Sequence, residues 1–199
     1  GRLWNGKFNY FRGAELMRRL NGIATMCIMI LFLVHMIWGG LLLMGLVKGG
    51  SPVFKAFSYA MMVFICIHVV IGLKLTVDTI IATNKSGVFY FKDNMLFLIR
   101  RISGFALLIF IAVHFIIFSG KSDDGVYRLR EFDMLALISQ ILMVISLIVH
   151  LITNIKPLRI SLGITDKRNL RTDIAIILSV LLFLSAVTFL IYYIRWQVI

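Results

Sequence analysis

The four histidines of this chain all lie inside long apolar stretches. They are His35, His68, His114 and His150, one in each of the first four apolar runs, and the loops contain none. An ionisable ring is costly in an apolar medium and marks a functional site when it is kept there. Neutral imidazole is a common ligand of transition metals. A single histidine of this kind can equally be a neutral ring that hydrogen-bonds to a neighbouring helix, so residue type alone leaves both interpretations open.

The positions of the histidines along their runs divide them into two pairs. Counted from the basic end of each run at about 1.5 Å per residue, His35 and His114 lie about 20 and 18 Å deep, and His68 and His150 both lie about 8 Å deep. Counted from the opposite ends, His35 and His68 are alike, which leaves a pairing of His35 with His68 as the alternative. The basic ends are the better reference because their charges anchor them at the membrane surface.

Two histidines at one level suit haem better than a bare metal ion. A zinc site needs four N, S or O ligands, and no carboxylate or cysteine stands at a matching depth. Haem iron takes only its axial ligands from the protein. The spacing therefore predicts two bis-histidine haems, one held by His35 and His114 and one by His68 and His150, about 10 Å apart along the membrane normal.

Basic residues and glycines near the histidines allow two interpretations each. The segments "HVVIGLK" and "HLITNIK" place Lys74 and Lys156 six residues after a histidine, about 9 Å along a helix. These lysines can bind haem propionates or simply extend to the membrane surface. The glycines of the apolar runs can admit either a macrocycle or a neighbouring helix. They are Gly39, Gly40, Gly72 and Gly104.

The elements that must position these residues follow from composition. The chain has 199 residues, of which 60% are hydrophobic and 15% charged, so most of it must be solvated by lipid. Its five uncharged runs are Gly22–Val47, Ala56–Leu73, Ile102–Gly120, Met134–Ile155 and Ile174–Ile194, and each is long enough to cross about 30 Å of hydrocarbon as a helix. We expect an all-α membrane protein.

The five runs predict one membrane domain, residues 1–199, built as a bundle of five transmembrane helices. The expected spans cover about 20–47, 56–80, 102–120, 134–155 and 174–195. Pro157 is expected to end the fourth helix. Cys27 and Cys66 fall in apolar helices and are expected to be small packing residues rather than a disulfide. The N-terminal "LWNGKFNYFRG" is not expected to be a signal peptide; it can lie in the headgroup layer or against a partner.

The net charge of +12 is explained by topology rather than by nucleic acid. Fifteen of the 21 Lys and Arg residues lie before the first run or in the second and fourth loops, which leaves six on the other side. The fifteen are Arg2, Lys7, Arg12, Arg18, Arg19, Lys74, Lys85, Lys92, Arg100, Arg101, Lys156, Arg159, Lys167, Arg168 and Arg171. The positive-inside rule then predicts a cytoplasmic N-terminus and an outside C-terminus.

One stretch gives the chain a resemblance to a known family. "RRISGFALLIFIAVHF" (100–115), together with one histidine on each of the first four spans, resembles the dihaem cytochrome b subunit of succinate:quinone oxidoreductases, which include succinate dehydrogenases and menaquinol:fumarate reductases. The resemblance implies the same two histidine pairs, and it implies that Arg19, Arg101 and Ser103 contribute to haem binding.

The resemblance also implies a setting. An iron–sulfur subunit and a flavoprotein subunit would dock on the cytoplasmic face of a bacterial cytoplasmic membrane, and this chain would carry electrons between their clusters and a quinone, menaquinone. By topology the quinone is expected near the haem of His35 and His114, which lies toward the outer face. The residues expected around it are Trp38, Ser51 and Lys55. Some menaquinol:fumarate reductases carry a glutamate on the fourth helix, whereas residue 148 here is Ile and none of the five spans is expected to contain Asp or Glu. The direction of the reaction therefore stays open.

Three rival classes are compatible with parts of the pattern. A cytochrome b561-type electron-transfer protein also distributes four histidines over four helices in two pairs, but it usually has a sixth span. Nitrate reductase gamma-type subunits have five spans, yet they place paired histidines on single helices. A proton or cation transporter with a histidine relay would need acidic partners inside the spans, which the uncharged runs lack.

The charge distribution yields a test of topology. A reporter that is active only outside the cytoplasm should be active when fused at Ile199, and a cytoplasmic reporter should be silent there, because the basic loops stay inside. The same two reporters fused in the loop after the second span serve as the control and should give the opposite result. Activity of the Ile199 fusion only in the cytoplasm would contradict the predicted orientation.

Overall fold

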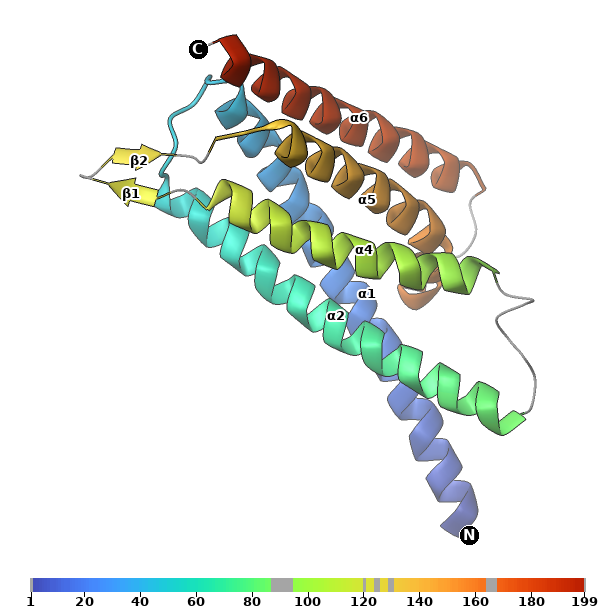
Figure 1. Cartoon of the computed structure of the whole chain (residues 1–199). Helices are drawn as coiled ribbons and strands as arrows, with labels where there is room; N and C mark the ends of the chain where they lie inside the picture. The colour runs from blue at the N-terminus through green and yellow to red at the C-terminus, as the bar shows by residue number, and fades with distance from the viewer. Residues whose placement is uncertain are drawn as a thin grey trace.

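The computed structural model describes residues 2–86, 95–119, 121–123, 126–128, 131–163 and 168–198, with side chains left undescribed at 2–12, 14, 86, 121–130, 168–171 and 173. Five long helices make up almost all of it (Figure 1). They are α1 (Arg2–Leu43), α2 (Pro52–Ser86), α4 (Met95–Phe118), α5 (Met134–Ser161) and α6 (Arg168–Val198). Two three-residue strands, β1 (Lys121–Asp123) and β2 (Val126–Arg128), form a small antiparallel hairpin between α4 and α5.

The predicted all-α fold with five membrane-spanning helices is confirmed. The segments long and apolar enough to span are Glu15–Leu43, Pro52–Lys85, Met95–Phe118, Met134–Ser161 and Ile174–Val198. The predicted boundaries are displaced, most clearly at the first span, which ends at Leu43 rather than 47, and at the third, which begins at Met95 rather than 102. The expectation that no span contains Asp or Glu is wrong, because Asp78 lies inside the predicted second span, 56–80, and Glu15 begins the first span of the structure.

The helices form two antiparallel pairs with α6 added to the second. Backbone contacts run chiefly between α1 and α2, between α4 and α5, and between α5 and α6, while α1 also touches α5 and α6. Figure 1 shows the α1–α2 turn, the small hairpin and the C-terminus at one end of the bundle, which we call the C-terminal end. The start of α1, the end of α2, the start of α4, the end of α5 and the start of α6 lie at the other, N-terminal end. The odd number of helices therefore puts the termini at opposite ends.

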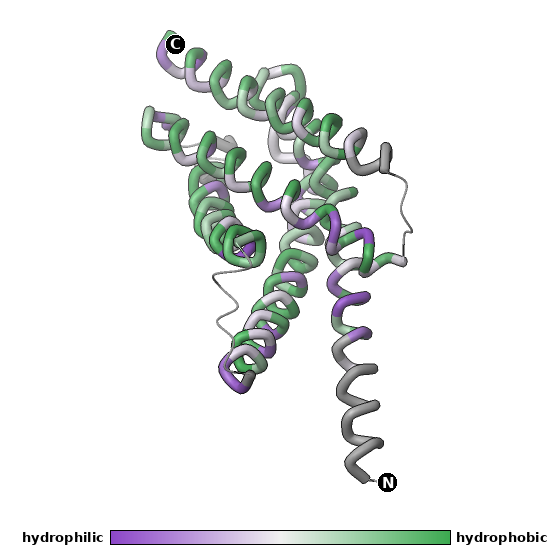
Figure 2. Tube along the Cα trace, turned by 90° about the vertical axis from the view of Figure 1, so that its right-hand side faces the viewer, coloured by the Kyte–Doolittle hydropathy of each residue, from purple (hydrophilic) through white to green (hydrophobic). Residues whose placement is uncertain are grey.

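The surface of the bundle is apolar, as expected of a multi-pass membrane protein. Val70 is 66% exposed and Leu135 is 74% exposed, and Figure 2 shows hydrophobic residues along most of every helix. In water such a surface would aggregate, whereas in hydrocarbon it is solvated. Lipid also cannot hydrogen-bond the backbone, so helices that satisfy their own peptide groups are the structure these runs must adopt. The continuous buried core is small and centres on Phe132, Leu182 and Phe189.

The end of α1 is closed by a residue from α6. Gly45 has φ +77°, a left-handed conformation that favours glycine, and its N–H donates to the carbonyl of Leu42 (2.9 Å). Arg195 Nη1 donates to the carbonyl of Leu43 (2.8 Å). A guanidinium at a helix C-terminus also interacts favourably with the helix dipole. These contacts end the first helix before residue 47.

Pro157 does not end the fourth span, contrary to the sequence-based expectation. The helix α5 continues through Pro157 to Ser161 and closes over Gly163 at φ +71°. Proline has no N–H for the carbonyl four residues earlier, which here belongs to Thr153. Arg100 on α4 supplies the missing donor, because its Nε lies 2.8 Å from that carbonyl oxygen. A partner from a neighbouring helix thus permits a proline inside a membrane helix.

This contact predicts a coupling between Arg100 and Pro157. Arg100→Met should lower the free energy of unfolding by about 1–3 kcal/mol, because it leaves the Thr153 carbonyl without a donor. In a Pro157→Ala background the alanine N–H can take that carbonyl, and the same change should cost much less. Thermal unfolding of the four proteins in one detergent gives the coupling energy. Equal costs of Arg100→Met in both backgrounds would show that the arginine stabilises the bundle by another route.

Candidate functional site

The structure brings the four histidines together as two pairs. The ring centroids of His35 on α1 and His114 on α4 are 6.0 Å apart, and those of His68 on α2 and His150 on α5 are 6.3 Å apart. These are the two pairs that depth along the helices predicts, and the alternative pairing of His35 with His68 does not occur. Each pair bridges from the α1–α2 hairpin to the α4–α5 hairpin. We call them the His35/His114 site and the His68/His150 site.

The ring separations suit two imidazoles on opposite sides of one metal ion. A bond from a metal to an imidazole nitrogen is about 2.0 Å long. In a five-membered ring with bonds of about 1.35 Å the nitrogen lies about 1.15 Å from the ring centre. Two imidazoles in line across one metal therefore have their centroids about 6.3 Å apart. Both pairs come within 0.3 Å of that value.

Each site offers two protein ligands rather than four. Among the residues that the structure describes, no group of three or more His, Cys, Asp or Glu side chains is placed to hold a metal ion. Zinc in a structural site takes four such ligands. A haem iron takes four nitrogens from its own macrocycle and needs only the two axial imidazoles. The two imidazoles at each site match in type and number the ligands that a haem iron takes from a protein.

Each of the four imidazoles hydrogen-bonds through Nδ1 to a polar side chain on a facing helix. His68 pairs with Thr25 Oγ1 (3.2 Å) and His35 with Ser58 Oγ (3.2 Å). His150 pairs with Ser103 Oγ (3.3 Å) and His114 with Gln140 Oε1 (2.7 Å). Metal-bound histidines characteristically give their second ring nitrogen to such a partner, which fixes the orientation of the ring.

The partners also determine which nitrogen carries the proton. An amide oxygen only accepts, so His114 must donate to Gln140 from Nδ1. The three hydroxyls donate their own protons within their helices, Thr25 to the carbonyl of Asn21, Ser58 to that of Phe54 and Ser103 to that of Arg100. Each hydroxyl oxygen therefore accepts from the imidazole. With Nδ1 protonated in a neutral ring, Nε2 carries the lone pair that a metal binds.

Every one of the four helices serves both sites. Its histidine belongs to one site, and its polar side chain, ten residues earlier on α1, α2 and α5 and eleven on α4, belongs to the other. Sequence reasoning missed Thr25, Ser58 and Gln140, and named Ser103 only through the family resemblance. The recurring interval of ten or eleven residues between a polar side chain and the histidine of the same helix was the signal that could have identified them. It corresponds to about 15 Å of helix, so the two levels are farther apart than the expected 10 Å.

Aromatic rings surround the His35/His114 site. Phe54 stacks on His35 at 5.4 Å between centroids, and Trp38 stacks on Phe54 at 5.9 Å. On the other side of the pair, the ring centroid of His114 lies 4.8 Å from that of Phe118 and 6.3 Å from that of Phe189. Ser51 accepts from the Phe54 N–H at 3.4 Å and so lies beside this stack. Trp38 and Ser51, proposed from sequence as neighbours of the quinone, are thus near His35, and Lys55 follows Phe54 directly on an exposed position.

The His68/His150 site has a polar and cationic surrounding. Arg101 is close enough to interact electrostatically with both rings, and its guanidinium carbon lies 4.8 Å from the ring centre of Phe97. Its Nε is buried and has no hydrogen-bond partner among the described residues. Gly104 lets the His150 ring lie against α4, because a Cβ there would come within 3.3 Å of Cε1. Close ring approach, rather than space for a macrocycle, is the observed role of this glycine.

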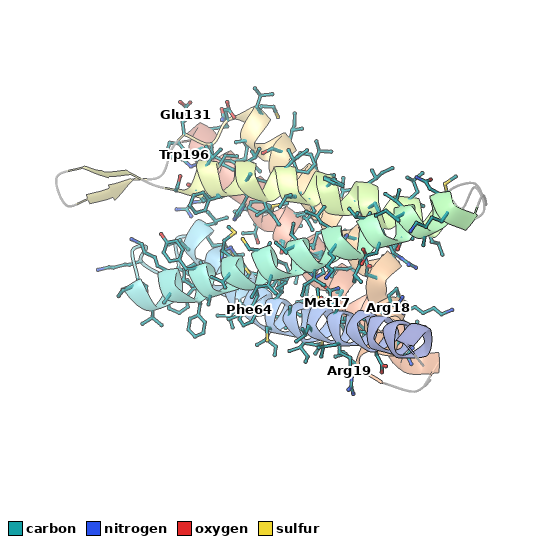
Figure 3. All side chains as sticks on the ribbon, turned by 90° about the horizontal axis from the view of Figure 1, so that it is seen from below. Met17, Arg18, Arg19, Phe64, Glu131 and Trp196 are labelled. Carbon is teal, nitrogen blue, oxygen red and sulfur yellow. The ribbon has the colours of Figure 1, made fainter. Side chains whose placement is uncertain are left out.

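The other predicted residues lie at the surface. Lys74, Lys156 and Arg19 are exposed, which favours the interfacial interpretation of the two lysines over contact with a propionate. Figure 3 places Arg18 and Arg19 toward the opposite end of the bundle from Trp196. The side chains of Trp4–Arg12, expected in the headgroup layer or against a partner, and residue Lys92, expected on the cytoplasmic side, lie outside the described part of the chain. Cys66 is exposed and Cys27 half-buried, and both are free thiols.

Comparison of the chain with protein-family models, with curated proteins and with solved structures finds no match.

Proposed function

We propose that this chain is the membrane cytochrome b subunit of a succinate:quinone oxidoreductase, which holds two bis-histidine haems and passes electrons between a peripheral iron–sulfur protein and a quinone. One observation carries the haem part of the proposal. Two histidine pairs, each contributed by facing helices, have ring centroids 6.0 and 6.3 Å apart and Nδ1 atoms already engaged by protein acceptors. The peripheral partners and the quinone come from the family resemblance.

The residues of the chain divide the work of binding. His35 and His114 would hold one haem and His68 and His150 the other, each through Nε2. A haem with two imidazole ligands supplies one-electron transfer, at a potential set by its ligands, their hydrogen bonds and its solvation. A haem held by two histidines of the chain would have no ligand position left for a small molecule, which suits electron transfer rather than oxygen chemistry.

Arg101 is the residue best placed to bind a propionate at the His68/His150 site. Its charge lies near both ligands, and its buried Nε lacks an acceptor among the described residues. A guanidinium can bind a carboxylate through two parallel hydrogen bonds. This assignment replaces Lys74 and Lys156, whose exposed positions point to the membrane surface.

The aromatic stack at the C-terminal end supports a quinone site next to the His35/His114 site. Trp38, Phe54 and His35 lie in successive contact, and flat rings of this kind bind another flat ring through their faces. Ser51, at the start of α2, adds a hydroxyl beside the stack. The quinone proposed from the resemblance is menaquinone.

The proposed function predicts the number of haems in the chain and which histidine variants lose the same haem. The purified chain should contain two b-type haems per polypeptide by pyridine haemochrome analysis. His35→Ala and His114→Ala should lose one haem and share one change in the reduced-minus-oxidised spectrum. His68→Ala and His150→Ala should lose the other, because each ring is half of one axial pair.

Matched variants elsewhere on the same helices control for general damage. Val34→Ala and Val149→Ala change exposed side chains next to a ligand in sequence and should keep both haems. A count of zero or one haem in the unchanged chain would overturn the proposal. So would a grouping of His35 with His68.

A cross-linking experiment distinguishes the proposed function from the cytochrome b561-type alternative. A photo-cross-linker placed at the exposed Lys85, at the N-terminal end of the bundle, should capture an iron–sulfur protein that copurifies with a flavoprotein. The same reagent at the exposed Leu135, near the start of α5, should not. A purified protein that contains both haems but no iron–sulfur or flavin partner would favour the b561-type function.

A further inference from the structure

The four acceptors that hold the imidazoles are not equivalent. Three are hydroxyls at 3.2, 3.2 and 3.3 Å from Nδ1, and the fourth is the amide oxygen of Gln140, at 2.7 Å from Nδ1 of His114. Gln140 is fully buried, with 0% of its surface exposed. A shorter hydrogen bond to a carbonyl oxygen in an apolar surrounding is the strongest of the four.

The orientation of Gln140 is fixed by its own neighbours. Its Nε2 donates to Ser139 Oγ at 3.0 Å, and Ser139 donates to the carbonyl of Ala136 at 2.7 Å. The N–H of Ala136 is in turn held by the Asp133 side chain that caps α5, at 2.7 Å. With the amide nitrogen occupied, Oε1 is directed at His114. The chain of contacts leads from the start of α5 to one ring of the His35/His114 site.

The three hydroxyls are weaker acceptors. Each hydroxyl lies more than 0.4 Å farther from its Nδ1 than Gln140 Oε1 lies from Nδ1 of His114. His114 therefore receives more electron density from its partner than any of the other three histidines. A stronger acceptor on the second nitrogen makes an imidazole a more basic ligand, and a more basic axial ligand stabilises oxidised over reduced iron.

We propose that Gln140 is a positioning residue that acts through His114 to lower the redox potential of the haem at the His35/His114 site relative to the haem at the His68/His150 site. This inference rests on the proposed haem function and adds a specific residue to it. Gln140 does not touch the iron. Together with the different surroundings of the two sites, it would give different potentials to haems that have the same type of protein ligands.

The test uses two substitutions that should act in opposite directions. Gln140→Met keeps the side-chain length and removes the acceptor, so the potential of the His35/His114 haem should rise by about 59 mV or more, a tenfold change in its one-electron equilibrium. Gln140→Glu provides a carboxylate, a stronger acceptor, and should lower the same potential. Spectroelectrochemical titration of the full chain in lipid nanodiscs measures both haems at once.

The control is the weaker partner at the same haem. Ser58→Ala removes the hydroxyl that faces His35 at 3.2 Å and should move the same potential less than Gln140→Met does. The redox potential of the His68/His150 haem should stay unchanged in all three variants. A general loosening of the bundle cannot produce shifts of opposite sign from one position, so equal or same-sign shifts for Met and Glu, or a common shift of both haems, would overturn the inference.

A measurement on the haem-free chain keeps this inference distinct from the proposed function. In ¹⁵N-histidine spectra of the haem-free protein, His114 should be protonated at Nδ1, and Gln140→Met should change the His114 signals while those of His35 stay as they are. Absence of haem from the wild-type protein would overturn both the function and the role in its potential, although the spectra would still report the hydrogen bond. Haem present with an unresponsive potential would overturn this inference alone.

Discussion

The structure depends on the need of each polar group in the membrane for a partner from another part of the chain. Hydrocarbon offers no hydrogen bonds, so an imidazole or a freed carbonyl inside it must be satisfied by protein. The Nδ1 contacts of the four histidines meet this need across helices. The contact from Arg100 to the Thr153 carbonyl meets it at the proline of α5. These bonds hold α1 in register with α2 and α4 in register with α5, so each of them acts within one hairpin.

Because every such contact crosses between elements, the two histidine sites are linked mechanically. Each of α1, α2, α4 and α5 carries a ligand for one site and an acceptor for the other. Sliding one helix by a turn along its neighbour would separate the partners at both sites together. An arrangement of this kind favours a single register within each hairpin, whereas the two hairpins meet at the histidine pairs and make fewer backbone contacts with each other.

The two sites differ in their surroundings while they share their ligands. Stacked and edge-on rings of Phe54, Phe118 and Phe189 surround the His35/His114 site, and the charge of Arg101 acts on the His68/His150 site. An apolar surrounding and a nearby cation change the relative stability of oxidised and reduced iron in different ways. In the proposed function, the two haems would therefore have different potentials although their protein ligands are of the same type.

The sequence by itself determined the class of fold and the pairing of the histidines. Runs of about twenty uncharged apolar residues have one stable form in lipid, so the five helices could be predicted. Since helices cross with a uniform rise, depth along the helix was enough to match His35 with His114 and His68 with His150. Helix ends were less predictable. Gly45 ends α1 where Arg195 donates to the Leu43 carbonyl, and α5 continues through Pro157 because Arg100 donates to the Thr153 carbonyl. In both places the arginine that donates the hydrogen bond belongs to a different helix.

Only the tertiary structure decided which small polar residues matter. Thr25, Ser58 and Gln140 look like ordinary residues of apolar helices, and their recurrence ten residues before a histidine has no meaning until the helices run antiparallel and face one another. The same holds for the basic residues. Lys74 and Lys156 share a spacing from histidine that suggested haem contact, and the structure leaves both exposed, whereas Arg101, named from sequence only through the resemblance, lies near His68 and His150. Rotation about the helix axis depends on packing between helices, which local spacing does not encode.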